Sequence, residues 1–472
     1  MPPDIKGEAV DELLQFLSEA PEFVCVAGRR FQRFARGDFR LQRFSGGLEF
    51  QCRGLHGRVE GSRWRRSTHR FSSSGRAGMV LLKPSRKNEL WLRRQRFRWG
   101  CEDLVRGRWK VVRTSFVLSR DGNSAILRMV LYKHGSWIVA VAAGAEEEVH
   151  AEAVLSQLFV HWRKFELSSA RQVEEGLLFI PRELAEMAAP LLRELRSAVK
   201  IYCLPDLRRF LPGEEASFPL LWPSPAVRAE MEALQGSFAF SPEVLAVIRN
   251  GRECSFEYLG IPFAVYQTGS AEWRFPLREQ ETASRICVPG GEDAARMARE
   301  EYQRIREIRR PHARVHSDVL FQRCSERWLE SLIVRDPKLL DRDLKSSPVY
   351  AQVPAYVTRR RVIDLVAVTE SGRLVVIEVK VLKELDLLYQ GLAYWGIVRE
   401  AQQHNAFQQN GYFTGIRLSS EPPLLYCVTP LLALHAEIRH LASRLRPEIE
   451  AYLIGINNQW RGGLKVLRKE RL

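Results

Sequence analysis

Three ionisable side chains stand on two neighbouring predicted strands that are otherwise apolar. The segments Arg361 to Val368 and Arg373 to Lys380 alternate with period two around Val, Ile and Leu, and a turn, Thr369 to Gly372, joins them. Side chains alternate between the faces of a strand, so Glu378 and Lys380 lie on one face. The hairpin brings Asp364 back beside them. The pattern predicts two carboxylates and one ammonium group together on an apolar frame.

Such a group suits phosphodiester chemistry at a divalent cation. Charges on an apolar frame are costly unless they are paired or bind a metal. Carboxylates from adjacent strands are hard oxygen ligands for Mg²⁺, which keeps several waters and takes further oxygens from a substrate phosphate. A neighbouring lysine can orient or deprotonate the attacking water and offset the negative charge that develops on phosphorus. We therefore expect Asp364 and Glu378 to bind Mg²⁺ or Mn²⁺ and Lys380 to act on the water.

The spacing Asp364-x13-Glu378-x-Lys380 resembles the core motif of the PD-(D/E)XK nuclease superfamily, with Ile363 in place of the nominal proline. Members of that superfamily carry a glutamine on the following helix, which Gln390 matches, and a glutamate on an upstream helix. Glu326 and Glu330 are both candidates for the upstream metal ligand, because residues four apart share one helix face. The resemblance covers residues 320–400, or 320–455 if the later strands belong, and is greatest to the branch of mismatch-directed endonucleases.

The resemblance implies a C-terminal α/β domain of restriction-endonuclease type, with a mixed central sheet flanked by helices. It also implies catalytic roles for Asp364, Glu378, Lys380 and Gln390. Two alternatives stay open. The hairpin could be solvated, with Glu378 and Lys380 as surface charges, although the apolar strands favour burial. The fold could also be retained without activity, although Asp364, Glu378 and Lys380 are all present.

The rest of the chain predicts a multidomain protein. Residues 1–165 indicate a β-rich basic domain, residues 166–311 a mixed α/β region without assignable chemistry, and residues 312–472 the α/β domain. That last domain is expected to contain a helix at 385–403, a strand at 424–428, an apolar segment at 451–456 and a basic tail at 465–471. No internal repeat is evident in the sequence.

The positive charge is concentrated near the N-terminus. The whole chain carries a formal charge of +16, whereas residues 29–113 contain 24 Lys and Arg against 6 Asp and Glu, a net charge of +18. Arginines interleaved with aromatic residues suit nucleic acid, because guanidinium groups bind phosphate and rings stack on bases. In a β-rich domain this alternation predicts one basic and one buried strand face. The candidate nucleic-acid-binding residues are Arg63, Trp64, Arg65, Arg66, Arg93, Arg94, Arg96 and Arg98.

Several classes of protein and site are disfavoured. The eight cysteines are at least 27 residues apart, which offers no zinc knuckle and favours free thiols in a reducing cytoplasm. No segment approaches the ~20 apolar residues of a membrane span. His435 and His440 are five apart, about 140° around a helix, and no third ligand is near. Gln352, twelve residues before Asp364, is a further candidate for facing the same cleft.

The sequence thus predicts a metal-dependent nuclease, an endonuclease rather than an exonuclease, that acts on DNA and binds it through the basic N-terminal domain. The alternative is a nucleic-acid-binding or assembly protein that keeps a nuclease fold without turnover. A third class, a protein that binds anionic lipid, would also explain the basic segment. The sequence leaves the oligomeric state open, a homodimer included.

Overall fold

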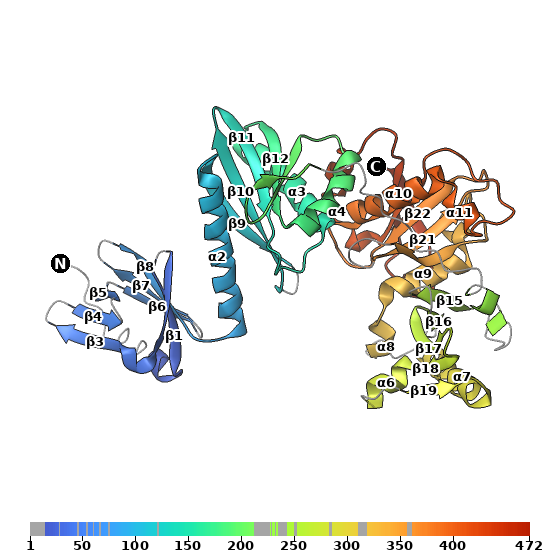
Figure 1. The fold of residues 1–472 in the computed structure, drawn as a ribbon, viewed down its shortest axis with the longest axis horizontal. Helices are drawn as coiled ribbons and strands as arrows, with labels where there is room; N and C mark the ends of the chain where they lie inside the picture. The colour runs from blue at the N-terminus through green and yellow to red at the C-terminus, as the bar shows by residue number, and fades with distance from the viewer. Residues whose placement is uncertain are drawn as a thin grey trace. The chain divides into compact units, whose positions relative to one another are not determined.

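The computed structural model divides into two compact units, Met1–Leu127 and Arg128–Leu472 (Figure 1). It describes residues 15–472 except 28, 45–46, 53–54, 60, 66–67, 74–75, 120–121, 212–226, 228, 232, 235–242, 250–252, 283–285, 310–318 and 356–360. The predicted division at 165/166 and 311/312 stays a prediction. Each unit is considered by itself.

Unit 1 contains two antiparallel sheets, followed by a long helix and a strand. One sheet has the order β2-β1-β8-β7-β6 and the other β3-β4-β5. The strands are β1 (Glu22–Ala27), β2 (Arg30–Ala35), β3 (Phe39–Phe44), β4 (Gly47–Cys52), β5 (Leu55–Val59), β6 (Gly61–Arg65), β7 (Thr68–Ser73), β8 (Arg76–Leu82) and β9 (Lys110–Leu118), and the helix is α2 (Arg86–Arg106).

Helix α2 corrects one expectation. In a β-rich domain the alternation of arginine and aromatic residues was expected to give one basic and one buried strand face, but the segment around Arg93 is helical for 21 residues, from Arg86 to Arg106. Ser85 caps the helix, because its hydroxyl accepts a hydrogen bond from the backbone N–H of Asn88 at 3.2 Å. The buried positions include the i,i+4 pairs Asn88 and Leu92 in the first half of the helix and Cys101 and Val105 in the second half. Long arginine stems cover apolar surface as well, so charge alternation alone did not identify the buried face.

The first part of unit 2 contains strands of one sheet in the order β14-β13-β12-β11-β10, covered by two helices. The boundary between the units falls inside β10. The elements are β10 (Ala125–Lys133), β11 (Ser136–Ala142), α3 (Ala151–Ser169), β12 (Val173–Ile180), α4 (Arg182–Arg193), β13 (Val199–Cys203) and β14 (Arg208–Arg209). Strands β11, β12 and β13 are parallel, and β14 is antiparallel to β13.

The middle of the chain forms an antiparallel sheet in the order β15-β16-β17-β18-β19. Its elements are β15 (Val244–Arg249), β16 (Glu253–Tyr258), β17 (Ile261–Gln267), β18 (Glu272–Arg274), α6 (Pro276–Thr282), β19 (Cys287–Pro289) and α7 (Glu292–Ile308). Phe256 and Trp273 of this sheet share one hydrophobic core with Trp328 and Ile377 of the C-terminal part. The middle region therefore packs directly on the C-terminal α/β fold.

The C-terminal part is a mixed six-stranded sheet flanked by helices, as the sequence predicts. Its elements are α8 (Val319–Gln322), α9 (Ser325–Arg335), β20 (Tyr350–Ala355), β21 (Arg361–Val368), β22 (Leu374–Val379), α10 (Leu387–Gln403), α11 (Ala406–Gln409), β23 (Leu424–Pro430), α12 (Ile438–Ala442), β24 (Ala451–Ile456) and β25 (Val466–Arg471). Strands β20, β21 and β22 are antiparallel, β22, β23 and β24 are parallel, and the expected basic tail is the antiparallel strand β25.

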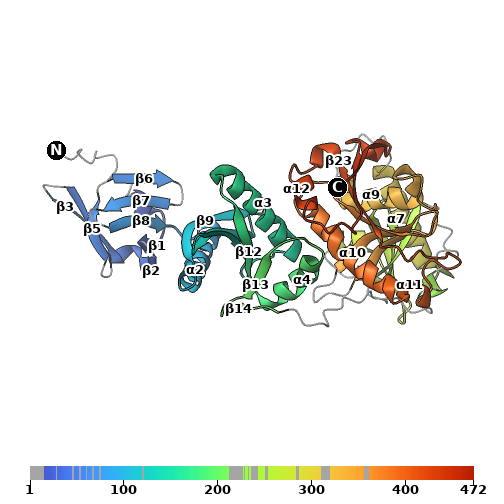
Figure 2. The same cartoon turned by 90° about the horizontal axis from the view of Figure 1, so that it is seen from above.

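Strand β22 is the centre of this sheet, and all six of its residues are buried. A run of Val and Ile suits a strand covered on both faces, where each buried side chain contributes about 1.5–3 kcal/mol. Ile377 and Val379 share the core with residues of α9. Gly391 of α10 approaches Glu378 on the other face. Helix α10 covers the sheet from that side (Figure 2).

Candidate active site

Asp364 and Glu378 lie opposite each other on β21 and β22. In the antiparallel pairing of these strands Leu365 is opposite Ile377, and continuing the register by one residue puts Asp364 opposite Glu378. Directly opposed residues of an antiparallel pair point to the same face. The backbone N–H of Val379 donates to Oδ2 of Asp364 at 2.9 Å, which fixes the carboxylate at the end of β22. The predicted pairing of the two carboxylates is thus present.

Glu378 is fully buried, at 0% exposure. Its Oε1 accepts a hydrogen bond from Nζ of Lys380 at 3.0 Å, whereas its Oε2 has no hydrogen-bond partner. Burial raises the pKa of Glu378 well above its ordinary value, and the negative charge of Asp364 raises it further. Burial also raises the pKa of Asp364. Two adjacent carboxyl groups therefore lack sufficient positive charge around them.

Lys380 follows β22 directly and is 7% exposed. Its Nζ lies 3.0 Å from Oε1 of Glu378 and 3.8 Å from Oε2 of Glu326. Burial lowers the pKa of Lys380, but the charges of Glu378, Glu326 and Asp364 outweigh burial and leave the pKa above its ordinary value. The side chain is therefore an ammonium ion, which donates hydrogen bonds and does not accept a proton.

Both upstream glutamates reach this group of residues from helix α9. Glu326 lies beside Lys380, and its side chain is 37% exposed. Burial raises its pKa, whereas Lys380 and a hydrogen bond from the backbone of Val381 lower it. Glu330 is only 3% exposed. Burial raises the pKa of Glu330 well above its ordinary value, with Asp364 as the next cause.

Gln352 of β20 is the partner of Glu330. Its Nε2 donates to Oε2 of Glu330 at 2.7 Å. Gln352 has a φ of +53°, a left-handed conformation that is costly for a residue with a side chain. The candidate at Gln352 therefore belongs to the same constellation as Glu330.

Gln390 lies in the first turn of α10, one residue before Gly391. Its Nε2 donates to the hydroxyl of Tyr394 at 3.3 Å. A Cβ at Gly391 would lie 3.3 Å from Cβ of Glu378 and 2.8 Å from Cδ1 of Leu425, so glycine permits the close approach of α10 to β22. The helix thus brings Gly391 against Glu378, whereas the amide of Gln390 is hydrogen-bonded within the helix.

An ion pair next to the site was not predicted from the sequence. Nη1 of Arg327, on α9, donates to Oε1 of Glu257 at 3.3 Å, and Glu257 of β16 is 2% exposed. The hydroxyl of Ser255 also donates to Glu257, at 3.1 Å. In the sequence Arg327 lies between Glu326 and Glu330, so its position could have indicated a residue next to the site. Glu257 is 70 residues upstream in a region without a motif, so local spacing gave no indication of it.

The carboxylates fit a divalent cation held by two ligands. Among the described residues, no group of three or more His, Cys, Asp and Glu side chains forms a metal-binding cluster. Mg²⁺ and Mn²⁺ sites in phosphoryl chemistry often use only one or two carboxylates, with water and phosphate completing the shell. The unpartnered, buried Oε2 of Glu378 opposite Asp364 is the feature that such a cation would satisfy. Asp364 and Glu378 therefore have the chemistry to bind Mg²⁺ or Mn²⁺.

The basic residues predicted on helix α2 have structural partners within unit 1. Nη2 of Arg94 donates to the carbonyl oxygens of Gly122 and Asn123, at 2.8 and 3.0 Å. The guanidinium of Arg96 lies 4.2 Å from the ring centre of Phe31. Nε of Arg98 donates to Glu102 at 2.8 Å. The binding role of this helix stays a prediction.

The other basic candidates lie on or beside strand β6. Arg63, Trp64 and Arg65 belong to that strand, and Arg66 follows it outside the described residues.

The two histidines considered for zinc have other neighbours. Nδ1 of His435 accepts a hydrogen bond from the backbone N–H of Glu437 at 3.2 Å, and Nε2 of His440 lies 3.2 Å from the carbonyl oxygen of Phe159. Burial lowers the pKa of both imidazoles. Seven cysteines are described, and all have free thiols.

Comparisons of the sequence with protein-family models and with curated proteins give no match. Over the ranges that the structure describes, no helix is both long enough and apolar enough to traverse a bilayer.

Proposed function

We propose that this chain is a Mg²⁺- or Mn²⁺-dependent nuclease that hydrolyses phosphodiester bonds in DNA. One observation carries the proposal: the buried carboxylate of Glu378 faces Asp364, has one oxygen without a hydrogen-bond partner and has its other oxygen on the ammonium group of Lys380. A buried ionisable group without compensation is costly. Its retention in a sheet of Val and Ile is explained by a ligand that provides positive charge.

Asp364 and Glu378 would hold the cation, with Glu330 or Glu326 as a further oxygen ligand through water. At these residues a bound divalent cation would supply positive charge to the phosphoryl oxygens, on which negative charge develops. Lys380 donates hydrogen bonds to the attacking water and to the phosphate, because its high pKa keeps it protonated. Gln390, one residue before the glycine that packs against Glu378, would orient the same water.

The basic segment of unit 1 supports nucleic acid as the substrate class. Its net charge of +18 over residues 29–113 contrasts with the near-neutral remainder of the chain. Phosphate contacts of this kind give affinity that does not depend on base sequence. We propose that unit 1 binds the backbone while the C-terminal fold hydrolyses it.

The test is a cleavage assay of the full chain on supercoiled, linear, single-stranded and branched DNA and on RNA, with Mg²⁺ or Mn²⁺. We expect cleavage of DNA that EDTA abolishes and that Asp364→Asn reduces to background. Glu370→Gln is the matched control, because Glu370 lies at the other end of the same hairpin and pairs with Lys338 and Lys345 on the surface. Full activity of Asp364→Asn, or cleavage unaffected by EDTA, would contradict the mechanism. Tight binding without cleavage of any substrate would favour the non-catalytic alternative.

A further inference from the structure

Two segments of unit 2 have the same order of elements. Residues 128–209, here the first copy, run β10, β11, α3, β12, α4, β13, β14. Residues 361–471, here the second copy, run β21, β22, α10, β23, α12, β24, β25, with the four-residue helix α11 inserted after α10 and a 3-10 turn inserted after each of β23 and β24. In both copies the second, third and fourth of these strands are parallel and the last is antiparallel. In both, the first helix packs on the strands before and after it (Figures 1 and 2).

The backbone hydrogen bonds show which residue of the first copy corresponds to which residue of the second. The N–H of Lys380, just after β22, donates to the carbonyl oxygen of Val428 at 3.0 Å. The N–H of Ala143, just after β11, donates to the carbonyl oxygen of Phe179 at 3.1 Å. Val428 and Phe179 are paired in turn with the residues that precede Lys380 and Ala143. Ala143 of the first copy therefore corresponds to Lys380.

The same register leaves the first copy without catalytic carboxylates. Two residues before Ala143 is Val141, which corresponds to Glu378. Strands β10 and β11 are joined by the two-residue turn at 134–135, in which both residues have positive φ, as in a tight type I′ hairpin. Such a turn pairs Lys133 with Ser136, and counting back along β10 pairs Arg128 with Val141. Arg128 therefore stands where Asp364 stands in the second copy.

The helices extend this correspondence to a glutamine. A Cβ at Gly176 of β12 would lie 3.0 Å from Cδ2 of Leu158 on α3, and a Cβ at Gly391 of α10 would lie 2.8 Å from Cδ1 of Leu425 on β23. Gly176 and Leu425 occupy the same register position. Leu158 then corresponds to Gly391, and the residue before it, Gln157, corresponds to Gln390.

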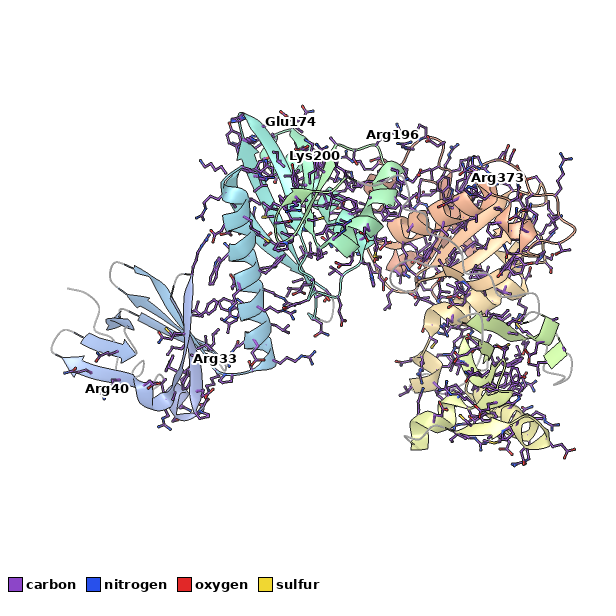
Figure 3. The ribbon with its side chains drawn as sticks, viewed as in Figure 1. Arg33, Arg40, Glu174, Arg196, Lys200 and Arg373 are labelled. Atoms are coloured by element: carbon purple, nitrogen blue, oxygen red, sulfur yellow. The ribbon has the colours of Figure 1, made fainter. Side chains whose placement is uncertain are left out.

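The copies also contact each other as the halves of a two-fold dimer do. Leu195, after α4, forms an antiparallel bridge with Leu445, after α12. The N–H of Arg196 donates to the carbonyl of Arg444 at 2.7 Å, and the N–H of Arg446 donates to the carbonyl of Glu194 at 3.1 Å. Arg196 lies on the side of the first copy that meets the second (Figure 3).

The helix contacts repeat this reciprocity. Helix α10 contacts α3 and α4, and α3 contacts α10 and α12. The two equivalent helices α3 and α10 contact each other, and each also contacts the second helix of the other copy. This reciprocal pattern is that of an isologous interface.

We propose that the first copy is a degenerate nuclease fold that binds a phosphate of the nucleic acid with Arg128, at the position where the second copy would bind its metal. This inference rests on the proposed function, because it takes a nucleic acid as the substrate. Arg128 is half-buried, and its Nη2 donates to Oε1 of Gln157. Its Nε has no hydrogen-bond partner. A guanidinium group held in this way offers a fixed fork to a phosphate.

Burial lowers the pKa of Arg128. Among the described residues, its positive charge therefore lacks a neighbouring negative charge, just as the negative charge of Glu378 lacks sufficient positive charge. Val141 and Ala143 provide neither a metal ligand nor an ammonium group, and the first copy therefore cannot hydrolyse a phosphodiester. Its role is to hold the strand, which leaves one active centre in each chain.

The test measures binding of a fluorescein-labelled 30-base-pair duplex by anisotropy, with the full chain carrying Asp364→Asn to prevent cleavage. Arg128→Met keeps the apolar stem and removes the fork. We expect Kd to rise about five- to tenfold and the slope of log K against log salt to become shallower by about one. Arg182→Met, an exposed arginine of the same copy, should leave both within twofold.

Circular dichroism and the thermal midpoint establish that the variants are folded. If Arg128→Met is unstable, Arg128→Lys decides: the salt slope should be retained while Kd still rises, because one ammonium replaces the fork. A folded Arg128→Met or Arg128→Lys that binds like Arg182→Met would overturn the inference. Failure of the nuclease proposal is a separate outcome. It would appear as absence of cleavage by the wild-type chain, whatever effect the Arg128 variants have on binding.

Discussion

The Nζ of Lys380 lies 3.0 Å from one carboxylate oxygen of Glu378, while the other oxygen of that buried carboxylate has no hydrogen-bond partner. The ammonium group therefore neutralises only part of the charge that Asp364 and Glu378 bring to the end of β22. This partial compensation separates the site from an ordinary buried ion pair, in which both groups are satisfied. It also gives Lys380 a role as a fixed positive charge.

The variant Lys380→Met removes that charge and keeps the length of the side chain. We expect the cleavage rate to fall about 100- to 1000-fold, as when a preorganised donor to the transition state is removed. Single-turnover cleavage of a labelled duplex measures the effect. Lys345→Met is the control, because Lys345 pairs with Glu370 at the far end of the same hairpin. Equal rates for the two variants would exclude Lys380 from the chemistry.

The two glutamates of α9 should affect the metal requirement differently. Glu330 is buried with Asp364 as its main charged neighbour, whereas Glu326 lies beside Lys380. We expect Glu330→Gln to raise the half-saturating Mg²⁺ concentration about tenfold, as for a residue of the metal environment, and Glu326→Gln to change it less than about threefold. Cleavage rates at a series of Mg²⁺ concentrations measure this. The reverse order would assign the upstream ligand to Glu326.

Each chain holds one complete set of Asp364, Glu378 and Lys380. On supercoiled plasmid we therefore expect nicked circles to accumulate first, with linear molecules following only after independent second cuts. A time course on an agarose gel separates the three forms. Linear DNA that appears without a nicked precursor would mean that two centres act together on one site.

Two glycines of helix α10 predict opposite effects on stability. A Cβ at Gly391 would lie 2.8 Å from Leu425 and 3.3 Å from Glu378, so we expect Gly391→Ala to destabilise the fold by about 1–3 kcal/mol. A Cβ at Gly396 would meet no atom within 4 Å. Gly396→Ala should therefore stabilise the helix by about 0.5–1 kcal/mol. Urea denaturation measures both, and a stabilising Gly391→Ala would refute the close packing of α10 on β22.

The ion pair of Arg373 and Glu450 gives a pH-dependent contribution to stability. Nη2 of Arg373 lies 2.8 Å from Oε1 of Glu450, and this hydrogen bond holds the pKa of Glu450 below its ordinary value. A carboxyl group with a lowered folded-state pKa stabilises the fold above its unfolded pKa, and the contribution is lost as the pH falls through the folded pKa.

We therefore expect Glu450→Gln to cost about 1 kcal/mol at pH 7, and this cost to disappear as the pH falls through the lowered folded-state pKa of Glu450. Urea denaturation over a series of pH values from neutral to acid measures the difference. A difference that persists unchanged at low pH would contradict this origin.

Local patterns were enough for the hairpin that carries the chemistry. The alternation of apolar and ionisable residues from Arg361 to Lys380 determines which side chains share a face, and the turn at Gly372 brings the two strands together. At that glycine φ is +86°, and a Cβ would collide with the carbonyl of Arg417. The strand β21 lies where the sequence predicts it. Local pattern was not enough at Arg93, where helical burial of arginine stems resembled strand alternation.

The sequence by itself therefore determined the mixed C-terminal sheet, the pairing of Asp364 with Glu378 and the concentration of positive charge near the N-terminus. Only the tertiary structure decided that both Glu326 and Glu330 approach the site, that Glu257 pairs with Arg327, and that Arg128 stands in the position of Asp364. These residues are far apart in the chain. The packing of helices and sheets brings them together, and that packing depends on the size and apolarity of the core side chains more than on their identity. Two segments with a similar order and direction of strands can consequently occur in one chain while the sequence shows no repeat.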